Sequence, residues 1–510
     1  MSFQSYWFAI FLALTVCLFY AVPKKLRLAV LLAANAVFFL WADVRAGVWL
    51  LLSVVSTWAA GLWLGRQYRA PEKMQKPRTH GAADVLVLAA TLALNLGLLA
   101  LFQYIPVWER ELEAAFGLRI PVLRLAAESG AGLAAPLGIS FYTLQAIGYL
   151  LDIWRGRGAA ERSLPRYAAF VSFFPNLMSG PIERGGHFLE QLDRVLAAKR
   201  RALLVYDRMA QGMISILLGF FMKLVIADRA ALLVDYLYGI YQDGNSFTMT
   251  MAALFYAVQI YCDFASYSCI AVGAAQLFGF ELIRNFRQPY FACGISDFWR
   301  RWHISLSSWL RDYVYIPLGG NRKGALRKEV NLVVVFLVSG LWHGGAPTFL
   351  LWGLLYGLLA AGEDLLGRAA GTTVCLRGGA LFRLRRLLGV PLTFCLVSLL
   401  WIIFRSESLE MAAVCLRNLF TRPQGFLMAG DFLYAMGLPR LEFWIAVGAA
   451  ALLFFLDFVS ERRGRETAVW IYESPLPVRW GLCLLLLALV AVFGRYGHGV
   501  DPTGFIYVDF

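Results

Sequence analysis

The sequence predicts an all-α protein that crosses a membrane many times, and two observations carry this prediction. Of its 510 residues, 60% are hydrophobic and only 16% are charged, whereas an ordinary globular chain is about 45–50% apolar and about 25% charged. The apolar residues also gather in runs close to the roughly 20 residues that a helix needs to cross a bilayer. This composition excludes a cytosolic globular protein, a disordered chain and a coiled coil.

Twelve apolar runs are candidates for membrane-spanning helices. The sixth and seventh are the longest, and we expect tilted or broken helices there. The first run has no positive residues ahead of it, so we expect an uncleaved first span and not a signal peptide. The predicted spans are about 5–22, 28–42, 47–65, 83–103, 132–153, 206–238, 247–279, 331–343, 348–366, 388–404, 441–459 and 480–496.

Lysine and arginine are distributed unevenly between the connections. Those that follow odd-numbered spans hold 35 of these residues, the other connections and the C-terminal tail hold 9, and three lie in the sixth span. Because positive residues accumulate on the cytoplasmic side, we expect both termini outside. The net charge of +14 therefore reflects membrane topology and not nucleic-acid binding, since the basic residues lie in short spacers between apolar runs.

Four connecting segments have unusual compositions. The outer segments 105–130 and 405–440 mix large apolar residues with both charge signs, as helices lying in a membrane interface do. The inner segments 164–188 and 290–320 are aromatic-rich, too polar to span, and punctuated by Pro and Gly. Irregular backbone at membrane depth is tolerated only inside the protein or beside a cavity, so we expect both to be re-entrant.

Few residues suggest chemistry. The eight cysteines are scattered without a CxxC pair, and there is no GxxxxGK[ST] loop. We therefore predict no disulfide framework, no metal site and no nucleotide hydrolysis. Of the five histidines, His80 and His498 are expected in solvated segments and His187 in a hydrogen-bonded loop. His303 and His343 remain as candidates.

His343 lies in the sequence VSGLWHGGAP. A helix that starts near Asn331 at the inner surface lifts it by about 18 Å, well into the hydrocarbon core. Gly344, Gly345 and Pro347 cannot continue a regular helix, so we expect the chain to open there. An ionisable residue at this depth indicates a functional site. The alternative is a neutral imidazole that hydrogen-bonds across helices.

His303 lies in SDFWRRWHISLSSWLRDY, where aromatic and apolar residues recur at three- and four-residue steps along one predicted helix face. Three basic residues, Arg300, Arg301 and Arg311, would flank or oppose that face. The pattern fits an interfacial helix with snorkelling arginines as well as a functional segment. The arginines could equally bind an anionic cofactor, because guanidinium pairs bidentately with phosphate. The predicted face consists of Trp299, Trp302, His303, Leu306, Trp309 and Leu310.

Two motifs carry a family resemblance. DFWRRWHISLSSWLRDYVYIPLGGNRKG (297–324) and SGLWHGGAPTFLLWGLLYG (339–357) strongly resemble the membrane-bound O-acyltransferase superfamily, and within it the bacterial alginate O-acetyltransferase type. We therefore expect a single transmembrane domain over 1–510 with a catalytic core region over 136–366. Further similar stretches lie at 136–156, 179–192, 259–280 and 505–510.

The resemblance implies a fold and a reaction. The fold is a ring of about ten to twelve transmembrane helices around a central tunnel that opens to the cytosol for an acyl thioester, either acetyl-CoA or another acyl donor. The implied enzyme is an O-acetyltransferase of the bacterial inner membrane that modifies an extracytoplasmic polysaccharide. We expect no bound cofactor, and a partner protein outside the membrane that accepts the acyl group.

The resemblance also maps two catalytic histidines onto His303 and His343. We expect His343 to be the general base that deprotonates the acceptor hydroxyl. His303, or the indole N–H of Trp302 or Trp342, would stabilise the oxyanion. The predicted donor-binding residues are Arg300, Arg301, Arg311 and Trp302.

Three positions depart from the family pattern: Cys269, Pro347 and Tyr356 stand where relatives usually or often have Asp, Trp and His. These departures bear on the acceptor and the donor more than on the reaction type. Three other functions stay open. They are D-alanyl transfer to teichoic acid, lipid or protein acylation by the same superfamily, and a transporter or channel, which would need the tunnel but not the deep histidine.

Overall fold

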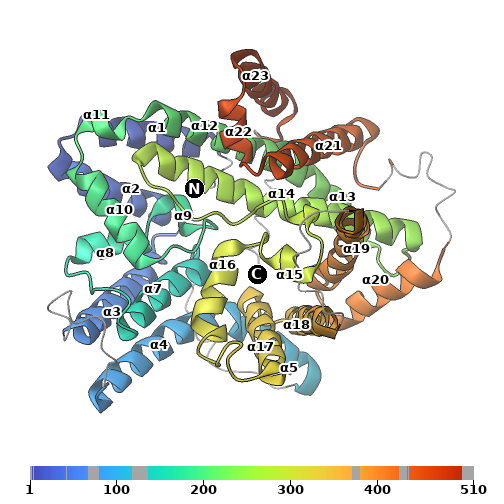
Figure 1. Cartoon of the computed structure of the whole chain (residues 1–510), viewed down its shortest axis with the longest axis horizontal. Helices are drawn as coiled ribbons and strands as arrows, with labels where there is room; N and C mark the ends of the chain where they lie inside the picture. Colours follow the sequence, from blue (N-terminus) through green and yellow to red (C-terminus); the bar gives the residue numbers. More distant parts are fainter. Residues whose placement is uncertain are drawn as a thin grey trace. The chain divides into compact units, whose positions relative to one another are not determined.

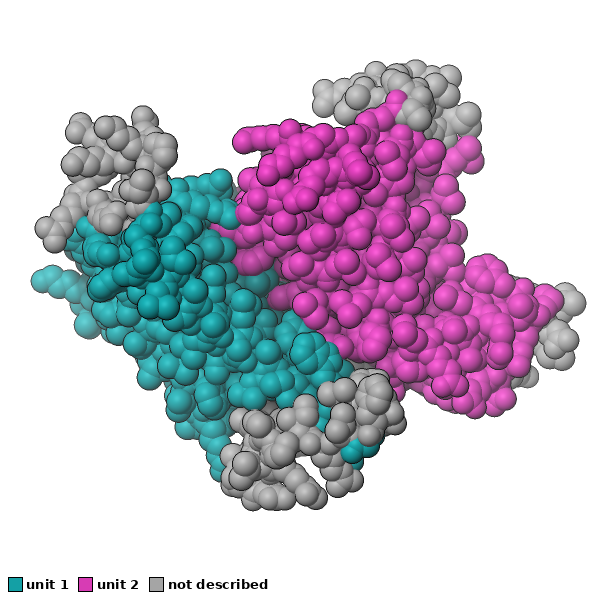
Figure 2. Space-filling view, turned by 90° about the horizontal axis from the view of Figure 1, so that it is seen from below, with its two compact units in different colours: residues 1–213, 271–283 teal, residues 214–270, 284–510 magenta. Residues whose placement is uncertain are grey.

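The described part of the chain is built from helices joined by irregular segments. The computed structural model (Figure 1) contains no strand among the described residues, which confirms the all-α prediction. The chain falls into two compact units, coloured separately in Figure 2: residues 1–213 with 271–283, and residues 214–270 with 284–510. The structure describes residues 3, 5–41, 43–66, 80–117, 136–369, 380–423, 434 and 436–496.

The predicted spans correspond to helices. Each of the twelve overlaps a helix, and eight helices in the described ranges are long and apolar enough to cross a membrane. A ninth apolar helix, Tyr6–Ala21, has only 16 residues. The protein is therefore a multi-pass membrane protein. The eight helices are Gly47–Gly65, Ala82–Gln103, Tyr206–Gly239, Ser246–Phe278, Pro347–Arg368, Leu387–Arg405, Arg440–Arg463 and Leu476–Phe493.

The first unit is built from the N-terminal helices. Arg27 shows how they are joined, because its buried guanidinium donates to the carbonyl oxygens of Val195 (3.0 Å) and Ala198 (2.8 Å). Basic groups at a helix C-terminus satisfy its last carbonyls. The helices of this unit are α1 (Tyr6–Ala21), η1 (Lys24–Leu26), α2 (Arg27–Leu40), α3 (Gly47–Gly65), α4 (Ala82–Gln103), α5 (Ile105–Phe116), α7 (Ile139–Trp154), α8 (Leu164–Val171), α9 (Phe174–Leu177), α10 (Gly185–Ala197), α11 (Arg200–Leu203) and the start of α12 (Tyr206–Phe220).

The segment 164–188 consists of short helices separated by buried irregular backbone. Residues 169–183 are all buried. The side chain of Asn35 donates to the Ser172 hydroxyl (3.2 Å) and accepts from the Phe174 amide (3.0 Å), which satisfies polar groups at the break. This agrees with irregular backbone enclosed by protein, as the re-entrant prediction requires.

The second unit contains the remaining helices. It shares α14 with the first unit, because the last residues of that helix belong to the latter. Its elements are the end of α12, η3 (Phe221–Ala227), α13 (Asp228–Gly239), α14 (Ser246–Phe278), η4 (Pro289–Phe291), α15 (Ile295–Trp299), α16 (Ile304–Leu310), η5 (Arg311–Tyr315), α17 (Ala325–His343), α18 (Pro347–Ala369), α19 (Ala380–Arg405), α20 (Leu409–Thr421), α21 (Arg440–Arg463), α22 (Thr467–Glu473) and α23 (Leu476–Phe493).

The two longest predicted spans are long helices. One runs for 34 residues through α12, η3 and α13, and α14 has 33 residues. The first contains the expected irregularity, since η3 is a π-helical turn. A π-helical turn leaves carbonyl groups without their usual partners. Arg229 donates to two of them, the oxygens of Leu224 and Val225, at 3.2 Å each.

Helices also occupy the two predicted outer segments. In α20 the Ser408 hydroxyl accepts from the Met411 amide at 3.1 Å and so caps the helix. This helix buries Met411 and Cys415 and exposes Leu409 and Phe420, an amphipathic arrangement. Parts of the outer segments, 118–130 and 424–433, lie outside the described residues, as do His498 and the C-terminal motif. The predictions of a single domain and of its core region stay predictions.

Candidate active site

Helices α17 and α18 form a tight hairpin (Figure 1). Their backbones approach closely at glycines. A Cβ atom at Gly340 would stand 2.3 Å from the carbonyl oxygen of Phe349, and one at Gly353 would stand 2.4 Å from that of Phe336. Small residues at such contacts let helices pack closely. The contacts fix the register of the hairpin and hence the place of the residues at its turn.

His343 is the last residue of α17, at the turn of this hairpin. Only 3% of it is exposed. Gly344 follows in an extended conformation (φ 164°), and α18 begins at Pro347, a position where the missing N–H costs no helical hydrogen bond. The predicted opening of the chain after the histidine is therefore confirmed, and it takes the form of a turn between two helices.

Aromatic rings surround His343. The distances from its ring centroid are 4.9 Å to Trp342, 5.2 Å to Phe404, 5.3 Å to Trp352 and 6.4 Å to Phe349. The Trp352 and Phe404 rings stand nearly perpendicular to the imidazole. A site with such walls has a low local dielectric, in which each hydrogen bond to a reacting atom is strengthened.

The structure brings the second histidine to the same aromatic cluster. The ring of Trp342 lies 5.5 Å from His303 and 4.9 Å from His343, so it contacts both imidazoles. His303 is fully buried, and Phe264 of α14 packs edge-on against it at 4.7 Å. The two candidates, which are 40 positions apart in the chain, therefore line one region of the second unit.

The continuous amphipathic helix predicted around His303 is wrong. Helix α15 ends at Trp299 and α16 begins at Ile304, and His303 between them is left-handed with φ 43°. Few non-glycine residues adopt this conformation, and those that do cluster at functional sites. The predicted face is thus divided over two short helices and a turn.

Backbone pairing with an upstream segment explains the break. The Arg287 amide donates to the carbonyl of Arg301, and the Ile304 amide donates to that of Asn285, both at 2.9 Å. The Asn285 side chain also accepts from the Ser305 hydroxyl at 2.6 Å. These bonds replace the helical ones that a continuous helix would make.

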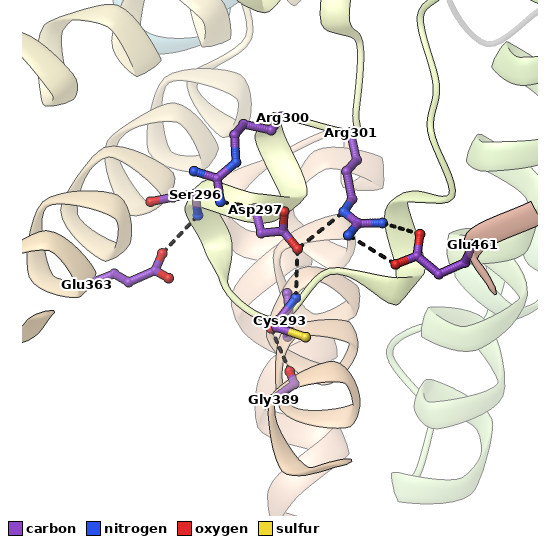
Figure 3. Close-up of polar contacts among 9 residues, drawn as sticks. Cys293, Ser296, Asp297, Arg300, Arg301, Glu363, Gly389 and Glu461 are labelled. Carbon is purple, nitrogen blue, oxygen red and sulfur yellow. Dashed lines mark hydrogen bonds and ion pairs between the residues drawn. The ribbon is translucent and has the colours of Figure 1, made fainter. Parts of the chain in front are cut away.

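A network of ion pairs holds α15 in place (Figure 3). Arg301 contacts two carboxylates, Asp297 at 3.2 Å and Glu461 of α21 at 2.7 and 3.2 Å. The Ser296 amide donates to Glu363 of α18 at 2.8 Å, and the Cys293 amide donates to Asp297 at 3.1 Å. The segment is therefore tied to α18 and α21 by charged groups.

The other predicted donor-binding residues differ in exposure. The side chains of Arg300 and Arg311 are 61% and 64% exposed, and each has one acidic neighbour, Asp297 and Asp312 respectively. Trp302, by contrast, is 1% exposed and packs among aromatic rings such as Trp401, 5.1 Å away. The four residues predicted together are thus two exposed guanidinium groups, one engaged guanidinium group and one core ring.

Four buried polar groups lie on the hairpin, and of these the sequence analysis singled out only Tyr356, as a departure from the family pattern. Thr348, Trp352 and Tyr356 recur at four-residue steps on α18, and Ser339 stands four residues before His343 on α17. All are buried, and their hydroxyl or indole groups have no hydrogen-bond partner among the described residues. Their spacing of four residues could have identified them in the sequence, but it occurs within an aromatic and apolar run.

A second buried polar cluster lies in the same unit. The ammonium of Lys223, in the π-helical turn, stands 2.5 Å from Asp263 of α14 and 3.0 Å from Asp228 of α13. All three residues are at most 3% exposed. The sequence placed Lys223 inside the sixth span, but its partners became evident only in the fold.

The first unit holds two more histidines, His187 and His80. The side chains of His187 and the buried Glu183 lie 2.9 Å apart, and this hydrogen bond to the carboxylate raises the pKa of His187. His80 stacks on Trp154 at 3.3 Å. No disulfide bond joins the seven described cysteines, and the described residues contain no group of three or more side chains suited to a metal ion.

Comparison with known proteins defines the class of enzyme. The model of the MBOAT, membrane-bound O-acyltransferase, family matches residues 159–377, which include both histidines and the hairpin. Curated relatives extend the similarity over nearly the whole chain. The chain belongs to the membrane-bound O-acyltransferase family and is an O-acyltransferase.

Three relatives indicate the range of acceptors. The Pseudomonas putida protein named "Probable alginate O-acetylase AlgI" is 35% identical over 98% of this chain and 98% of its own length. The "Peptidoglycan O-acetyltransferase" of Helicobacter pylori is 35% identical over 56% of this chain and 57% of its own. The "Teichoic acid D-alanyltransferase" of Bacillus subtilis is 28% identical over 44% and 57%.

Proposed function

We propose that this enzyme transfers an acetyl group from acetyl-CoA in the cytosol towards hydroxyl groups of an extracytoplasmic polysaccharide. The observation that carries the proposal is the pair of buried histidines whose rings both contact Trp342 beside a helix turn. The full-length similarity to a protein named as an alginate O-acetylase supports an acetyl group and a polysaccharide acceptor.

We assign His343 the role of general base. Transfer needs the acceptor hydroxyl to lose its proton as its oxygen attacks the thioester carbon, and a neutral imidazole can take that proton. The same imidazole can return the proton to the departing thiolate. Burial of His343 among aromatic rings supports this role, because it keeps competing water away from the thioester.

We assign His303 and Trp302 to the donor. His303 is held in a left-handed conformation at the start of α16, which fixes its position relative to Trp342. It would orient or polarise the thioester, while the Trp302 ring would form an apolar wall beside it. This division of roles predicts that the two histidines differ in their effect on KM and kcat.

The exposed guanidinium groups of Arg300 and Arg311 are suited to the phosphates of the donor. A guanidinium pairs bidentately with phosphate, and each of these side chains is more than half exposed. Arg301 belongs to the same proposed donor site, and its two carboxylate partners support a role in positioning the α15 segment.

The proposed orientation places both termini outside the cell and the acyl donor inside. The excess of lysine and arginine in the connections after odd-numbered spans supports it. The acetyl group would then cross the inner membrane through the enzyme. A partner protein outside would take it onward to the polysaccharide, since acyl thioesters are made in the cytosol.

The test is incorporation of labelled acetyl groups into extracytoplasmic polymer, normalised to the amount of enzyme in the membrane. Positioned proton transfer contributes about 10²–10⁴-fold, so His343→Ala should reduce transfer to near background. His303→Ala should lose less activity and show part of its loss in KM for acetyl-CoA. Wild-type transfer by His343→Ala would refute the mechanism.

D-alanyl transfer is the second candidate, because a teichoic acid D-alanyltransferase is similar over 44% of this chain. That activity would use a carrier protein as its donor. Purified enzyme offered both donors distinguishes the two functions. Consumption of acetyl-CoA alone supports acetyl transfer, whereas consumption of an aminoacylated carrier protein alone supports the alternative.

A further inference from the structure

We propose that the Thr348 hydroxyl and the Trp352 indole N–H bind the carbonyl oxygen of the acyl group and stabilise the oxyanion that forms there. This inference rests on the proposed function, since it names further catalytic groups at the same site. It assigns the oxyanion to α18, whereas the sequence suggested His303, Trp302 or Trp342 for that role.

The Thr348 hydroxyl and the Trp352 indole N–H have unused hydrogen-bonding capacity. Thr348 and Trp352 are both 0% exposed, and neither the Thr348 hydroxyl nor the Trp352 Nε1 has a partner among the described residues. Burying such a group without a partner costs about 1–3 kcal/mol. A group that the fold leaves in this state beside a catalytic histidine is available to bind a substrate atom.

Thr348 and Trp352 both lie on the helix that follows His343 after the hairpin turn. Trp352 lies edge-to-face with His343, with ring centroids 5.3 Å apart. Thr348 lies one helical turn before Trp352 on the same face of α18 and five residues after His343. Both groups therefore come from the helix that faces the general base across the hairpin turn.

The N-terminal end of α18 favours negative charge near Thr348. Thr348 belongs to the first turn of α18, a helix of 23 residues whose N-terminal end carries a partial positive charge. Developing negative charge on a carbonyl oxygen is stabilised there. The effect is greatest in a site without water, such as the aromatic surroundings of His343.

The Trp352 side chain is held rigidly by its neighbours. The Trp352 ring contacts Trp401 at 5.9 Å, Phe404 at 5.1 Å and Tyr356 at 5.0 Å. Gly353, which follows Trp352 in the chain, packs closely against the backbone of Phe336, and this contact fixes the backbone beside Trp352. Donors that are held in place before the reaction need no reorganisation during it, which is the condition for effective oxyanion stabilisation.

The step is balanced without a further reactant. The acceptor oxygen bonds to the thioester carbon and its proton moves to His343, while the carbonyl π electrons move to the oxygen held by Thr348 and Trp352. When the carbonyl reforms, the carbon–sulfur bond breaks and the thiolate receives the proton from His343. The products are the ester and the free thiol.

The test compares Thr348→Val and Trp352→Phe, each of which removes a donor while keeping most of the side-chain volume. Loss of one oxyanion donor costs about 10²-fold in kcat. We expect kcat and kcat/KM to fall together, with acetyl-CoA binding by the purified enzyme unchanged. Thr348→Ser keeps the hydroxyl and should retain most of the activity, which a purely structural role would not predict.

Matched controls change residues whose polar groups already have partners. The buried Thr393 hydroxyl donates to Gly389 at 2.7 Å, and the Trp470 indole donates to Ser460 at 2.7 Å. Thr393→Val and Trp470→Phe should keep the wild-type kcat per folded enzyme, although they can lower thermal stability.

The outcomes separate this inference from the proposed function. If His343→Ala abolishes transfer while Thr348→Val and Trp352→Phe keep the wild-type kcat, the inference is wrong and the function stands. If His343→Ala remains active, the proposed function itself fails. Should Trp352→Phe not accumulate in the membrane, the Thr348 pair decides, because equal activity of its Val and Ser variants would overturn the proposal.

Discussion

Two buried polar regions of the second unit differ in how their polar groups are satisfied. Around Lys223, both carboxylates lie within 3.0 Å of the ammonium. In the α17–α18 hairpin, Thr348 and Trp352 are as deeply buried but have no partner among the described residues. Both regions lie on helices that the sequence places in the membrane.

The difference separates stability from chemistry. Charges that satisfy one another hold helices together and have little capacity left for a ligand. Polar groups left without partners lower stability, and in our proposal a bound substrate supplies the missing partner of Thr348 and Trp352. We therefore expect substitutions around Lys223 to reduce stability and substitutions of Thr348 or Trp352 to reduce the rate of transfer.

The largest expected effect is the loss of the Lys223 ammonium. Lys223→Met leaves the carboxylates of Asp228 and Asp263 buried without their cation, and breaking a buried pair in this way costs about 3–5 kcal/mol. We expect little folded enzyme in membranes and a lower temperature of unfolding in detergent, measured by the thermal transition of the purified protein.

The control for this variant is Lys328→Met, because Lys328 and its partner Asp364 are about a quarter exposed. A pair that water reaches contributes less than a fully buried one, so this variant should accumulate normally. If Lys223→Met folded like the wild type and lost only transfer, the Lys223 cluster would belong to the chemistry and the comparison would break down.

A smaller effect should distinguish two neighbouring arginines. Arg301→Gln removes the cation between Asp297 and Glu461, and hydrogen bonds to charged groups contribute about 1.5–3 kcal/mol, less here because the pair is partly exposed. We expect a lower unfolding temperature and reduced activity. Thermal unfolding and acetyl-CoA kinetics of the same preparation measure both.

Arg300→Gln should instead leave the unfolding temperature unchanged and raise the KM for acetyl-CoA, since a phosphate far from the reacting carbon contributes mainly uniform binding. The side chain of Arg300 is 61% exposed and, among the described residues, forms one ion pair, 3.5 Å long, with Asp297. The opposite assignment, with Arg300 needed for stability and Arg301 only for KM, would contradict the proposed division.

The smallest effect concerns pH and lies in the first unit. The hydrogen bond to Glu183 raises the pKa of His187, so folding favours the protonated imidazole. This stabilisation is fully present below the unfolded pKa of about 6.5 and is lost as pH rises through the higher folded pKa. The unfolding temperature should therefore fall slightly across that window.

A His187→Gln variant provides the reference, because it cannot titrate. The difference in unfolding temperature between the wild type and this variant should shrink as the pH rises. A constant difference would show that the His187–Glu183 contact does not depend on charge. The effect should be small because 45% of the His187 side chain is exposed to solvent.

Local patterns predicted the helices and the turn at His343. Apolar runs define spans by length alone, and the Gly344–Gly345 pair can only interrupt a helix. The helix predicted through His303 failed because the backbone of residues 285–287 bonds to it, and periodicity contains no such information. Similarly, Arg301 resembled a phosphate ligand until the fold brought Glu461 to it from 160 positions away.

The length of the two longest spans has a consequence for the lipid. The helices of 34 and 33 residues measure about 50 Å at 1.5 Å per residue, whereas the hydrocarbon core is about 30 Å thick. They must tilt, project beyond the acyl chains or change the local bilayer thickness. Lys223 and Asp263 lie on these two helices. We therefore expect the enzyme's stability to vary with the acyl-chain length of the surrounding phospholipids.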